Sequence, residues 1–205
     1  HDTGDKANIK SNTNINQSKF LFEDGGNAAA YLHRIREYFP DYYQRLVRHI
    51  RNVVTNFKDF ELEPLDRHKQ TVLLRWQDQS GHIFGPHQLS DGSLRFILLS
   101  IVFLQPPDLM PNLIIIDEPE LGLHPRAIQE LAGMVRMASD HAQIILSTQS
   151  PNLLDFFDLD EIQVVEPHMN GTRLETQINR LSEEDFTEWL EKYTPSELMD
   201  MKVLS

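Results

Sequence analysis

Cysteine is absent from the 205 residues of this sequence. A chain without thiols can form neither disulfides nor thiolate metal sites, and this composition is typical of proteins from a reducing compartment. No apolar stretch approaches the roughly 20 residues that a helix needs to cross a bilayer, and no secretory signal is visible. We therefore expect a cytoplasmic protein that makes no use of a membrane.

Positive charge is scarce as well. Lysine and arginine number 19 against 31 aspartate and glutamate residues, so the formal net charge is −12. The excess is concentrated at one end, because residues 155–205 contain 13 acidic and four basic side chains. Such a segment repels a phosphate backbone, which argues against nucleic-acid contact there.

What is present is an ordinary globular composition, with 40% hydrophobic and 24% charged residues. Residues 1–19 are rich in asparagine, serine, aspartate and lysine and show no hydrophobic periodicity, so we expect a disordered tail. Residues 20–88 are expected to form a pair of helices and a small antiparallel strand pair. The helices are predicted at 28–39 and 41–56, and the strands at 57–63 and 70–77.

Five arginines are expected on the outer surfaces of the two helices: Arg34, Arg36, Arg45, Arg48 and Arg51. The simpler interpretation is a solvated helical face. The alternative is a patch that binds phosphates, such as those of a DNA backbone.

Residues 89–178 alternate between strand and helix patterns, which predicts an α/β fold with a parallel sheet core. The apolar runs have no polar alternation, so we expect strands buried on both faces. Ligands of such sheets bind at the carboxyl ends of the strands. The expected order is helix 90–105, strand 112–116, helix 125–139, strand 143–146, helix 150–157, and strands 162–165 and 173–178. Residues 179–205 are expected to form C-terminal helices, at 182–192 and from 194 onward.

Two carboxylates follow the first of these strands directly, in the run Leu113-Ile-Ile-Ile-Asp-Glu-Pro119. Successive side chains of a strand point in different directions, so Asp117 and Glu118 can serve different purposes. One carboxylate can hold Mg²⁺ with its waters, and the other can polarise a water aligned with a terminal phosphate. An exposed strand end with two acids is the simpler alternative.

Two further motifs are expected near the same edge of the sheet. Ser90-Asp91-Gly92 precedes an apolar helix, whose N-terminus favours anions, although Ser90 or Asp91 can equally be a plain helix cap. The apolar strand at 143–146 ends in Ser-Thr-Gln, and the Gln149 amide could reach a γ-phosphate or the attacking water. A simple turn into a proline-started helix is the alternative for Gln149.

The order and spacing of these motifs resemble the C-terminal half of an ABC-type ATPase head, in particular the SMC- and RecF-related group of AAA-family ATPases with a P-loop NTPase fold. The resemblance is carried by residues 24–29, 84–92, 113–125, 144–151 and 189–191. It implies that Asp117 coordinates Mg²⁺, that Glu118 activates the hydrolytic water, and that Gln149 occupies the switch position. It further implies that Ser90 and Gly92 contact the γ-phosphate of ATP held by an opposing protomer, and that Gly122 and His124 lie in the loop that crosses the dimer interface.

A P-loop with the pattern Gly-x-x-x-x-Gly-Lys-Ser/Thr is missing, because no glycine is followed by lysine anywhere in the chain. That loop supplies much of the grip on a triphosphate, so we expect this chain alone to bind ATP weakly and to be inactive. The resemblance implies an N-terminal Walker A segment as a partner. A truncated chain, one half of a split protein and a degenerate head are the explanations left open.

Two functions therefore stand side by side. The first is a component of a Mg²⁺-dependent, ATP-hydrolysing head that works as a head-to-head homodimer in DNA maintenance or anti-phage defence. The second is a catalytically incomplete module that binds an effector protein or nucleic acid. Histidines are scattered without a His-Glu-x-x-His pattern, which makes a zinc enzyme the weaker interpretation.

Overall fold

The computed structural model describes residues 4, 7–65, 70–170, 173–182, 186, 189 and 192–201. The chain divides into two compact units, His1–Leu146 and Ser147–Ser205. Each unit has its own helices and strands and its own buried residues.

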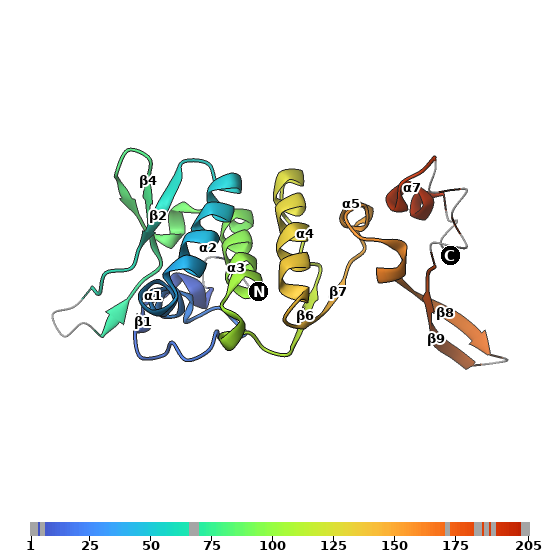
Figure 1. The fold of residues 1–205 in the computed structure, drawn as a ribbon, viewed down its shortest axis with the longest axis horizontal. Coiled ribbons are helices and arrows are strands. Elements are labelled where there is room, and N and C mark those ends of the chain that lie inside the picture. Colours follow the sequence, from blue (N-terminus) through green and yellow to red (C-terminus); the bar gives the residue numbers. More distant parts are fainter. Residues whose placement is uncertain are drawn as a thin grey trace. The chain divides into compact units, whose positions relative to one another are not determined.

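The first unit contains four helices: α1 (Ala28–Tyr38), α2 (Pro40–Val53), α3 (Asp91–Leu104) and α4 (Pro125–Ser139). In Figure 1, α2, α3 and α4 stand side by side, and α1, viewed nearly end-on, packs mainly against α2. Helix α3 lies between α2 and α4, and after its first turn and Arg95 it is apolar on nearly all sides. Nine of its 14 residues are buried. A helix without a polar face has to be enclosed by other elements, and α3 is accordingly the centre of this core.

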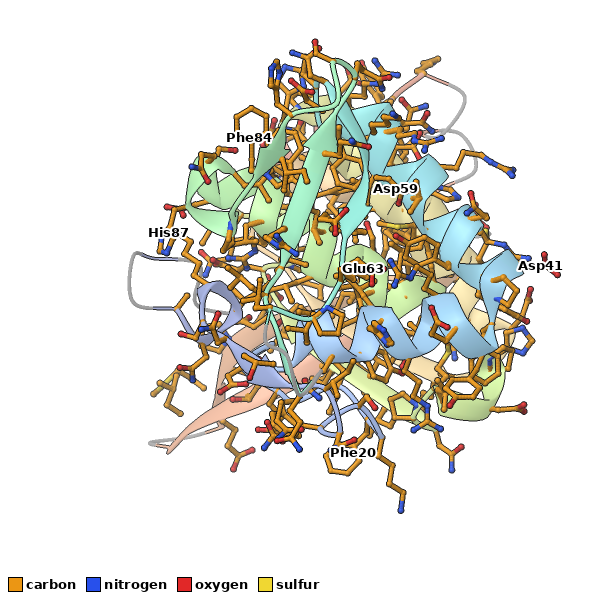
Figure 2. The ribbon with its side chains drawn as sticks, turned by 90° about the vertical axis from the view of Figure 1, so that its left-hand side faces the viewer. Phe20, Asp41, Asp59, Glu63, Phe84 and His87 are labelled. Atoms are coloured by element: carbon orange, nitrogen blue, oxygen red, sulfur yellow. The ribbon has the colours of Figure 1, made fainter. Side chains whose placement is uncertain are left out.

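The predicted antiparallel strand pair is confirmed, with a third short strand beside it. Strands β2 (Phe57–Glu61), β4 (Arg75–Asp78) and β5 (Ile83–Phe84) form one antiparallel sheet in the order β2-β4-β5. The aromatic rings of Phe57, Trp76 and Phe84 stack across it, with centroids 6.1 and 4.9 Å apart. Figure 2 shows this sheet with Phe84 near its outer strand. The two residues of β5 are too short a run to reveal alternation.

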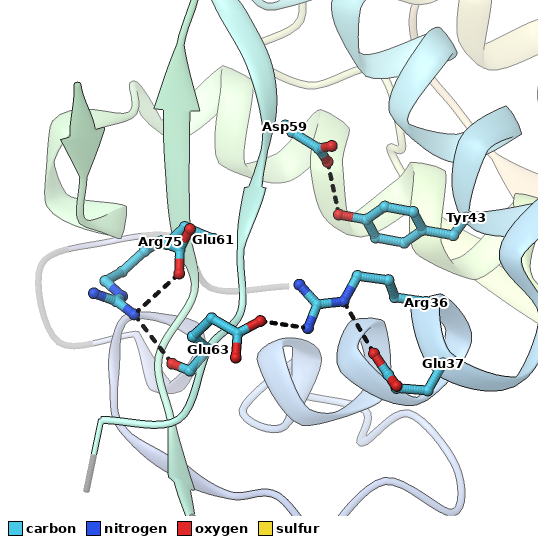
Figure 3. A network of polar contacts seen from close by, with 7 residues as sticks. All are labelled: Arg36, Glu37, Tyr43, Asp59, Glu61, Glu63 and Arg75. Carbon is cyan, nitrogen blue, oxygen red and sulfur yellow. Dashed lines mark hydrogen bonds and ion pairs between the residues drawn. The ribbon is translucent and has the colours of Figure 1, made fainter. Parts of the chain in front are cut away.

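Polar contacts fasten this sheet to the first two helices (Figure 3). The Tyr43 hydroxyl on α2 donates to Asp59 on β2 over 2.7 Å. Arg36 on α1 pairs with Glu63, just after β2, over 3.1 Å. Within the sheet itself, Arg75 on β4 pairs with Glu61 on β2 over 3.6 Å. The helix pair and the sheet are thereby held as one assembly.

These contacts also bear on the predicted arginine surface. Arg36 pairs with Glu63, Arg34 donates to the carbonyl oxygen of Ser18, and Arg51 donates to that of Lys58. The guanidinium carbon of Arg45 stands 5.1 Å from the centre of the Tyr42 ring. Four of the five arginines therefore have partners within the chain, which favours the simpler interpretation, a solvated helical face, over a phosphate-binding patch.

The expected disordered tail at 1–19 does not hold for the residues that the structure describes there. Asn8–Lys10 forms a 3-10 turn, η1, and β1 (Thr13–Asn14) pairs antiparallel with β3 (Thr71–Val72). Ile9 is buried, with 2% of its surface exposed. One apolar side chain and one strand pairing anchor this polar segment, and neither has a periodic signature in the sequence.

The predicted parallel sheet is present as two strands, β6 (Leu113–Asp117) and β7 (Gln143–Ser147), connected through α4. All their residues except Ser147 belong to the first unit. The amide of Gln143 donates to the carbonyl oxygen of Asn112 over 2.9 Å, so both strands begin side by side and run the same way. The sheet is not buried on both faces, however. Ile114 is 5% exposed, whereas Ile115 is 66% and Ile145 is 47% exposed. Apolar composition alone therefore overestimated the burial of these strands.

The second unit contains α5 (Pro151–Leu154), the strands β8 (Gln163–Asn170) and β9 (Arg173–Arg180), and α7 (Pro195–Asp200). The strand predicted at 162–165 was expected to extend the parallel sheet. It belongs instead to β8, which pairs antiparallel with β9 over its whole length. A short connection makes the hairpin partner the nearest one. Four buried side chains form the core of this unit: Leu159, Ile162, Leu181 and Leu198.

Several smaller elements complete the described chain. The 3-10 turns are η2 (Pro86–Gln88), η3 (Pro107–Leu109) and η4 (Leu159–Glu161). The helix predicted from 194 onward is confirmed as α7, and a capping box between Thr194 and Glu197 opens it. The helix expected at 182–192 lies largely outside the described residues.

None of the helices in the described parts of the chain is both long and apolar enough to traverse a bilayer.

Candidate active site

The two predicted carboxylates stand where the parallel strand β6 ends. Asp117 is the last residue of β6 and is exposed, and Glu118 follows it half-buried. Glu118 has a φ of 44°, a left-handed conformation that residues other than glycine seldom adopt. Such a conformation costs on the order of 1 kcal/mol and persists only where neighbouring groups hold it. The chain thus turns sharply at the carboxylate proposed for catalysis.

The carbonyl oxygen of Glu118 accepts two hydrogen bonds. Nη2 of Arg95, on α3, donates to it over 2.7 Å. The backbone amide of Leu121 donates to it over 3.2 Å and closes the turn. The strained peptide is therefore held both by its own turn and by a guanidinium from another element.

The loop after Glu118 leads into α4. Gly122 has a φ of 76°, and Leu123 donates its amide to the carbonyl oxygen of Glu120 over 2.9 Å. His124 is the N-cap of α4, where its Nδ1 accepts from the amide of Arg126 over 3.4 Å. Gly122 and His124 are both exposed. The loop predicted to cross a dimer interface thus lies on the surface, while its role there stays a prediction.

The second motif opens α3. Oγ of Ser90 accepts from the amide of Ser93 over 3.1 Å, so Ser90 is the helix cap that the simpler interpretation expected. Its side chain and that of Asp91 are exposed. Lys10 of η1 approaches Asp91, with 3.4 Å between Nζ and Oδ1, although the Lys10 side chain is only 6% exposed. A nearly buried cation therefore stands beside the acidic residue of this motif.

Both motifs meet within the first unit. Arg95, about one turn into α3, reaches Glu118, and Gly92 lies against the backbone of Gly122. The structure thus brings Ser90 and Gly92 to the loop that carries Glu118, Gly122 and His124. Gln149 is exposed and follows β7 as part of the second unit, so its predicted position beside Glu118 stays a prediction.

Sequence reasoning missed two cations, Arg95 and Lys10. A signal existed for Arg95, because it is the only basic residue of the mostly apolar helix 91–104. No local signal existed for Lys10, which lies in a segment expected to be disordered.

The donor atoms fit a magnesium ion of the kind that nucleotide-binding sites use. Mg²⁺ takes oxygen ligands and is commonly held by one or two carboxylates, waters and substrate phosphates. Asp117 offers an exposed carboxylate at the end of a strand. No cluster of three or more metal-ligating side chains occurs among the described residues, and a site completed by phosphates requires none.

Known proteins match this chain both by family and by fold. The model of the AAA_21 family, described as "AAA domain, putative AbiEii toxin, Type IV TA system", matches residues 5–155. No curated protein matches the chain by sequence. Solved structures match its fold, among them one described as "Structural biochemistry of ATP-driven dimerization and DNA stimulated activation of SMC ATPases", with a TM-score of 0.53 and 13% identity. That match covers 78% of this chain and 96% of the other.

Two longer SMC heads match as well. The head of Pyrococcus furiosus, bound to the C-terminal domain of ScpA, has a TM-score of 0.54 and 14% identity, over 82% of this chain and 44% of the other. The head of Pyrococcus yayanosii, with a coiled coil and joint, has a TM-score of 0.51 and 13% identity, over 79% and 32%. At such low identity these matches show the fold alone, and this chain spans less than half of either protein.

Proposed function

Because this chain belongs to the AAA_21 family of AAA domains and has the fold of SMC ATPase heads, we propose that it is the carboxylate-bearing lobe of a Mg²⁺-dependent ATPase. The observation that carries this proposal is the meeting of Glu118 with the start of α3 within one unit. Carboxylates at a strand end and a helix N-terminus are what a triphosphate with its metal ion requires.

The roles follow from chemistry and position. Asp117 is exposed at the strand end and would hold Mg²⁺ with its waters, and the ion would neutralise charge on the phosphates. Glu118 would orient and polarise the attacking water, with Gln149 as a second contact to that water. Ser90 and Gly92 would meet the γ-phosphate of a nucleotide bound to a second protomer.

The decisive experiment replaces Glu118 by glutamine in the complete protein that includes a Walker A segment. The carboxamide keeps the shape of the side chain but loses its negative charge and its basicity. We expect turnover to fall by at least about a hundredfold while ATP binding and ATP-dependent dimerisation persist. Asp117→Asn is expected to raise the Mg²⁺ concentration needed for half-maximal activity. Unchanged turnover in Glu118→Gln would rule out the catalytic role and favour a non-catalytic binding module.

The β6–β7 sheet has an exposed apolar face, and we propose that a lobe carrying the Walker A segment covers this face. Three apolar side chains of β6 and β7 are about half exposed or more: Leu113, Ile115 and Ile145. Parallel sheets are normally covered on both faces, and isolated two-stranded sheets are marginal. The lobe would cover this face and supply the P-loop, and the chain alone would then bind ATP weakly.

Comparing one substitution in two contexts tests this partner. Ile115→Glu should change the stability of this chain alone by about 0.5 kcal/mol or less, since the side chain is exposed. In the complete head the same substitution should cost about 2–4 kcal/mol, because a carboxylate would be buried without a partner. Ile83→Glu on β5, where Ile83 is 50% exposed, is the control and should cost little in both. Equal small effects of Ile115→Glu in both contexts would show that the lobe does not cover this face.

The wider role is proposed from the family description. That description names a toxin of a type IV system, which supports anti-phage defence ahead of DNA maintenance. One of the matched structures was studied for ATP-driven dimerisation and DNA-stimulated activation. We therefore propose a head-to-head homodimer whose hydrolysis responds to DNA or an effector protein. Sedimentation of the Glu118→Gln protein with and without ATP would test the dimer: a single monomeric species in both conditions would exclude it.

A further inference from the structure

We propose that Arg95 is a positioning residue for Glu118, and that it connects the first turn of α3 to the catalytic carboxylate. This inference rests on the proposed function, since it assigns a role relative to Glu118. Arg95 itself is placed to touch backbone and not substrate: its Nη2 donates to the carbonyl oxygen of Glu118 over 2.7 Å.

The first argument comes from the backbone of Glu118. Its φ of 44° places the residue in the left-handed region, where a glutamate is disfavoured. A hydrogen bond from a guanidinium is charge-assisted and is stronger than one between neutral groups. Arg95 therefore stabilises the peptide that aims the Glu118 side chain. Without Arg95, this carbonyl oxygen would depend on the amide of Leu121, which donates over a longer 3.2 Å.

The second argument comes from the helix that carries Arg95. Ser90 caps α3 and Gly92 stands in its first turn, with Arg95 about one turn further along. The body of α3 is buried between α2 and α4, so its first two turns move as a rigid piece. A phosphate that contacts Ser90 or Gly92 would therefore act on Arg95, and through it on Glu118. Occupancy of one nucleotide site would in this way be transmitted to the carboxylate of the other.

The third argument concerns the charge of Arg95. It is half-buried and is the only basic residue of α3. A leucine or alanine there would match the remainder of the helix and would avoid desolvating a guanidinium. The contact with the Glu118 carbonyl oxygen supplies a reason for an arginine at this position.

The test compares variants of the complete head, containing the Walker A segment. Arg95→Ala should lower kcat roughly tenfold to a hundredfold, the range in which a small misplacement of a catalytic group falls. The KM for ATP should stay within about twofold, and ATP-dependent dimerisation should persist, because Arg95 does not contact nucleotide. Arg95→Lys should recover part of kcat, since an ammonium still offers a donor. Lys58→Ala, which removes an exposed cation of β2, is the control and should leave kcat unchanged.

A double variant and hydrogen exchange separate positioning from general stability. Arg95→Ala combined with Glu118→Gln should be no slower than Glu118→Gln alone, since both act on one step. Amide exchange of residues 117–123 should speed up in Arg95→Ala while that of α4 is unchanged.

The outcomes distinguish this inference from the function on which it rests. Wild-type kcat in Arg95→Ala, with Glu118→Gln inactive, overturns the positioning role and leaves the ATPase proposal standing. Additive losses in the double variant, or a KM that rises in proportion to the loss of kcat, also overturn it. Normal turnover in Glu118→Gln overturns both proposals.

Discussion

Gly92 lies so close to Gly122 that a Cβ on Gly92 would stand 2.5 Å from the carbonyl oxygen of Gly122. The resemblance implies that Gly92 contacts the γ-phosphate of ATP, which is one reason for a glycine at this position. The structure adds a reason that requires no nucleotide, namely the packing of α3 against the loop that follows Glu118. The two explanations act at the same position and are compatible.

The Gly92–Gly122 contact predicts that Gly92→Ala destabilises the chain. Helix propensity by itself would make alanine the better residue in the first turn of α3, by up to about 1 kcal/mol. The clash is with backbone, so we expect a net loss of about 1–3 kcal/mol in urea unfolding. The control is Gly133→Ala in α4, where a Cβ meets nothing within 4 Å and a gain of about 0.5–1 kcal/mol is expected. A gain at both positions would contradict the close approach.

Asn27 is expected to be a second sensitive position. Asn27 occupies the N-cap position of α1, but its side chain makes no capping bond to the helix. It is fully buried and accepts from the amide of Phe22 over 2.8 Å, while it donates to the carbonyl oxygens of Gln17 and Phe20. Asn27→Ala leaves these groups without a partner and should cost about 2–3 kcal/mol. Thermal unfolding measures this loss, with Asn52→Ala as a control that loses a single exposed hydrogen bond, to Glu130.

A loss at Asn27 no larger than that of the Asn52 control would mean that the segment 17–22 is not held by this side chain. Asn27→Asp sharpens the test. A carboxylate can accept from Phe22 but would face two carbonyl oxygens, so aspartate should not restore stability.

The polar network of Figure 3 predicts unequal contributions from its members. Burial raises the pKa of Tyr43, and the bond to Asp59 adds to the shift, so the hydroxyl remains a donor at neutral pH. Tyr43→Phe should therefore cost about 1–1.5 kcal/mol. Glu63→Gln loses an ion pair whose acidic side chain is 67% exposed, and should cost at most about 1 kcal/mol, falling with added salt. Urea unfolding at low and high salt measures both; a larger loss for Glu63→Gln would reverse this ranking.

The free energy of unfolding is expected to depend on pH through His33 on α1. Burial lowers the pKa of His33 below its ordinary 6.5, and Arg36 lowers it further, against opposing contributions from Glu37 and Glu63. The unfolded chain then binds the proton more readily than the folded one. Stability should be full above pH 6.5 and should decline as the pH falls below it.

The measurement for His33 is thermal unfolding between about pH 8 and about pH 5. Glutamine cannot take up the proton, so the stability of His33→Gln should decline less below pH 6.5. The exposed His141→Gln serves as the matched control and should leave the curve as it was. An unchanged slope in His33→Gln would exclude this histidine as a source of the decline.

Much of the local structure could be predicted from the sequence. The periods of apolar residues located α3 and α4, and the run before Asp117 located β6. The capping box at Thr194 was visible because its partners are three residues apart. Motif order was sufficient to indicate the family and the SMC-like fold. In each case the interacting groups are close along the chain, so the pattern carries the information.

The tertiary structure alone decided what depends on distant partners. Ile115 and Ile145 have the composition of fully buried strands, yet nothing in their own segments tells whether a layer covers them. The strand at 162–165 could join either of two sheets, and pairing with β9 decided which. The donor to Glu118 comes from Arg95, 23 positions earlier, and the groups satisfied by Asn27 lie in a loop without periodicity. Which side chains are buried, and which remote groups form hydrogen bonds, depends on how distant segments pack against one another. Local propensity and residue spacing do not contain this information.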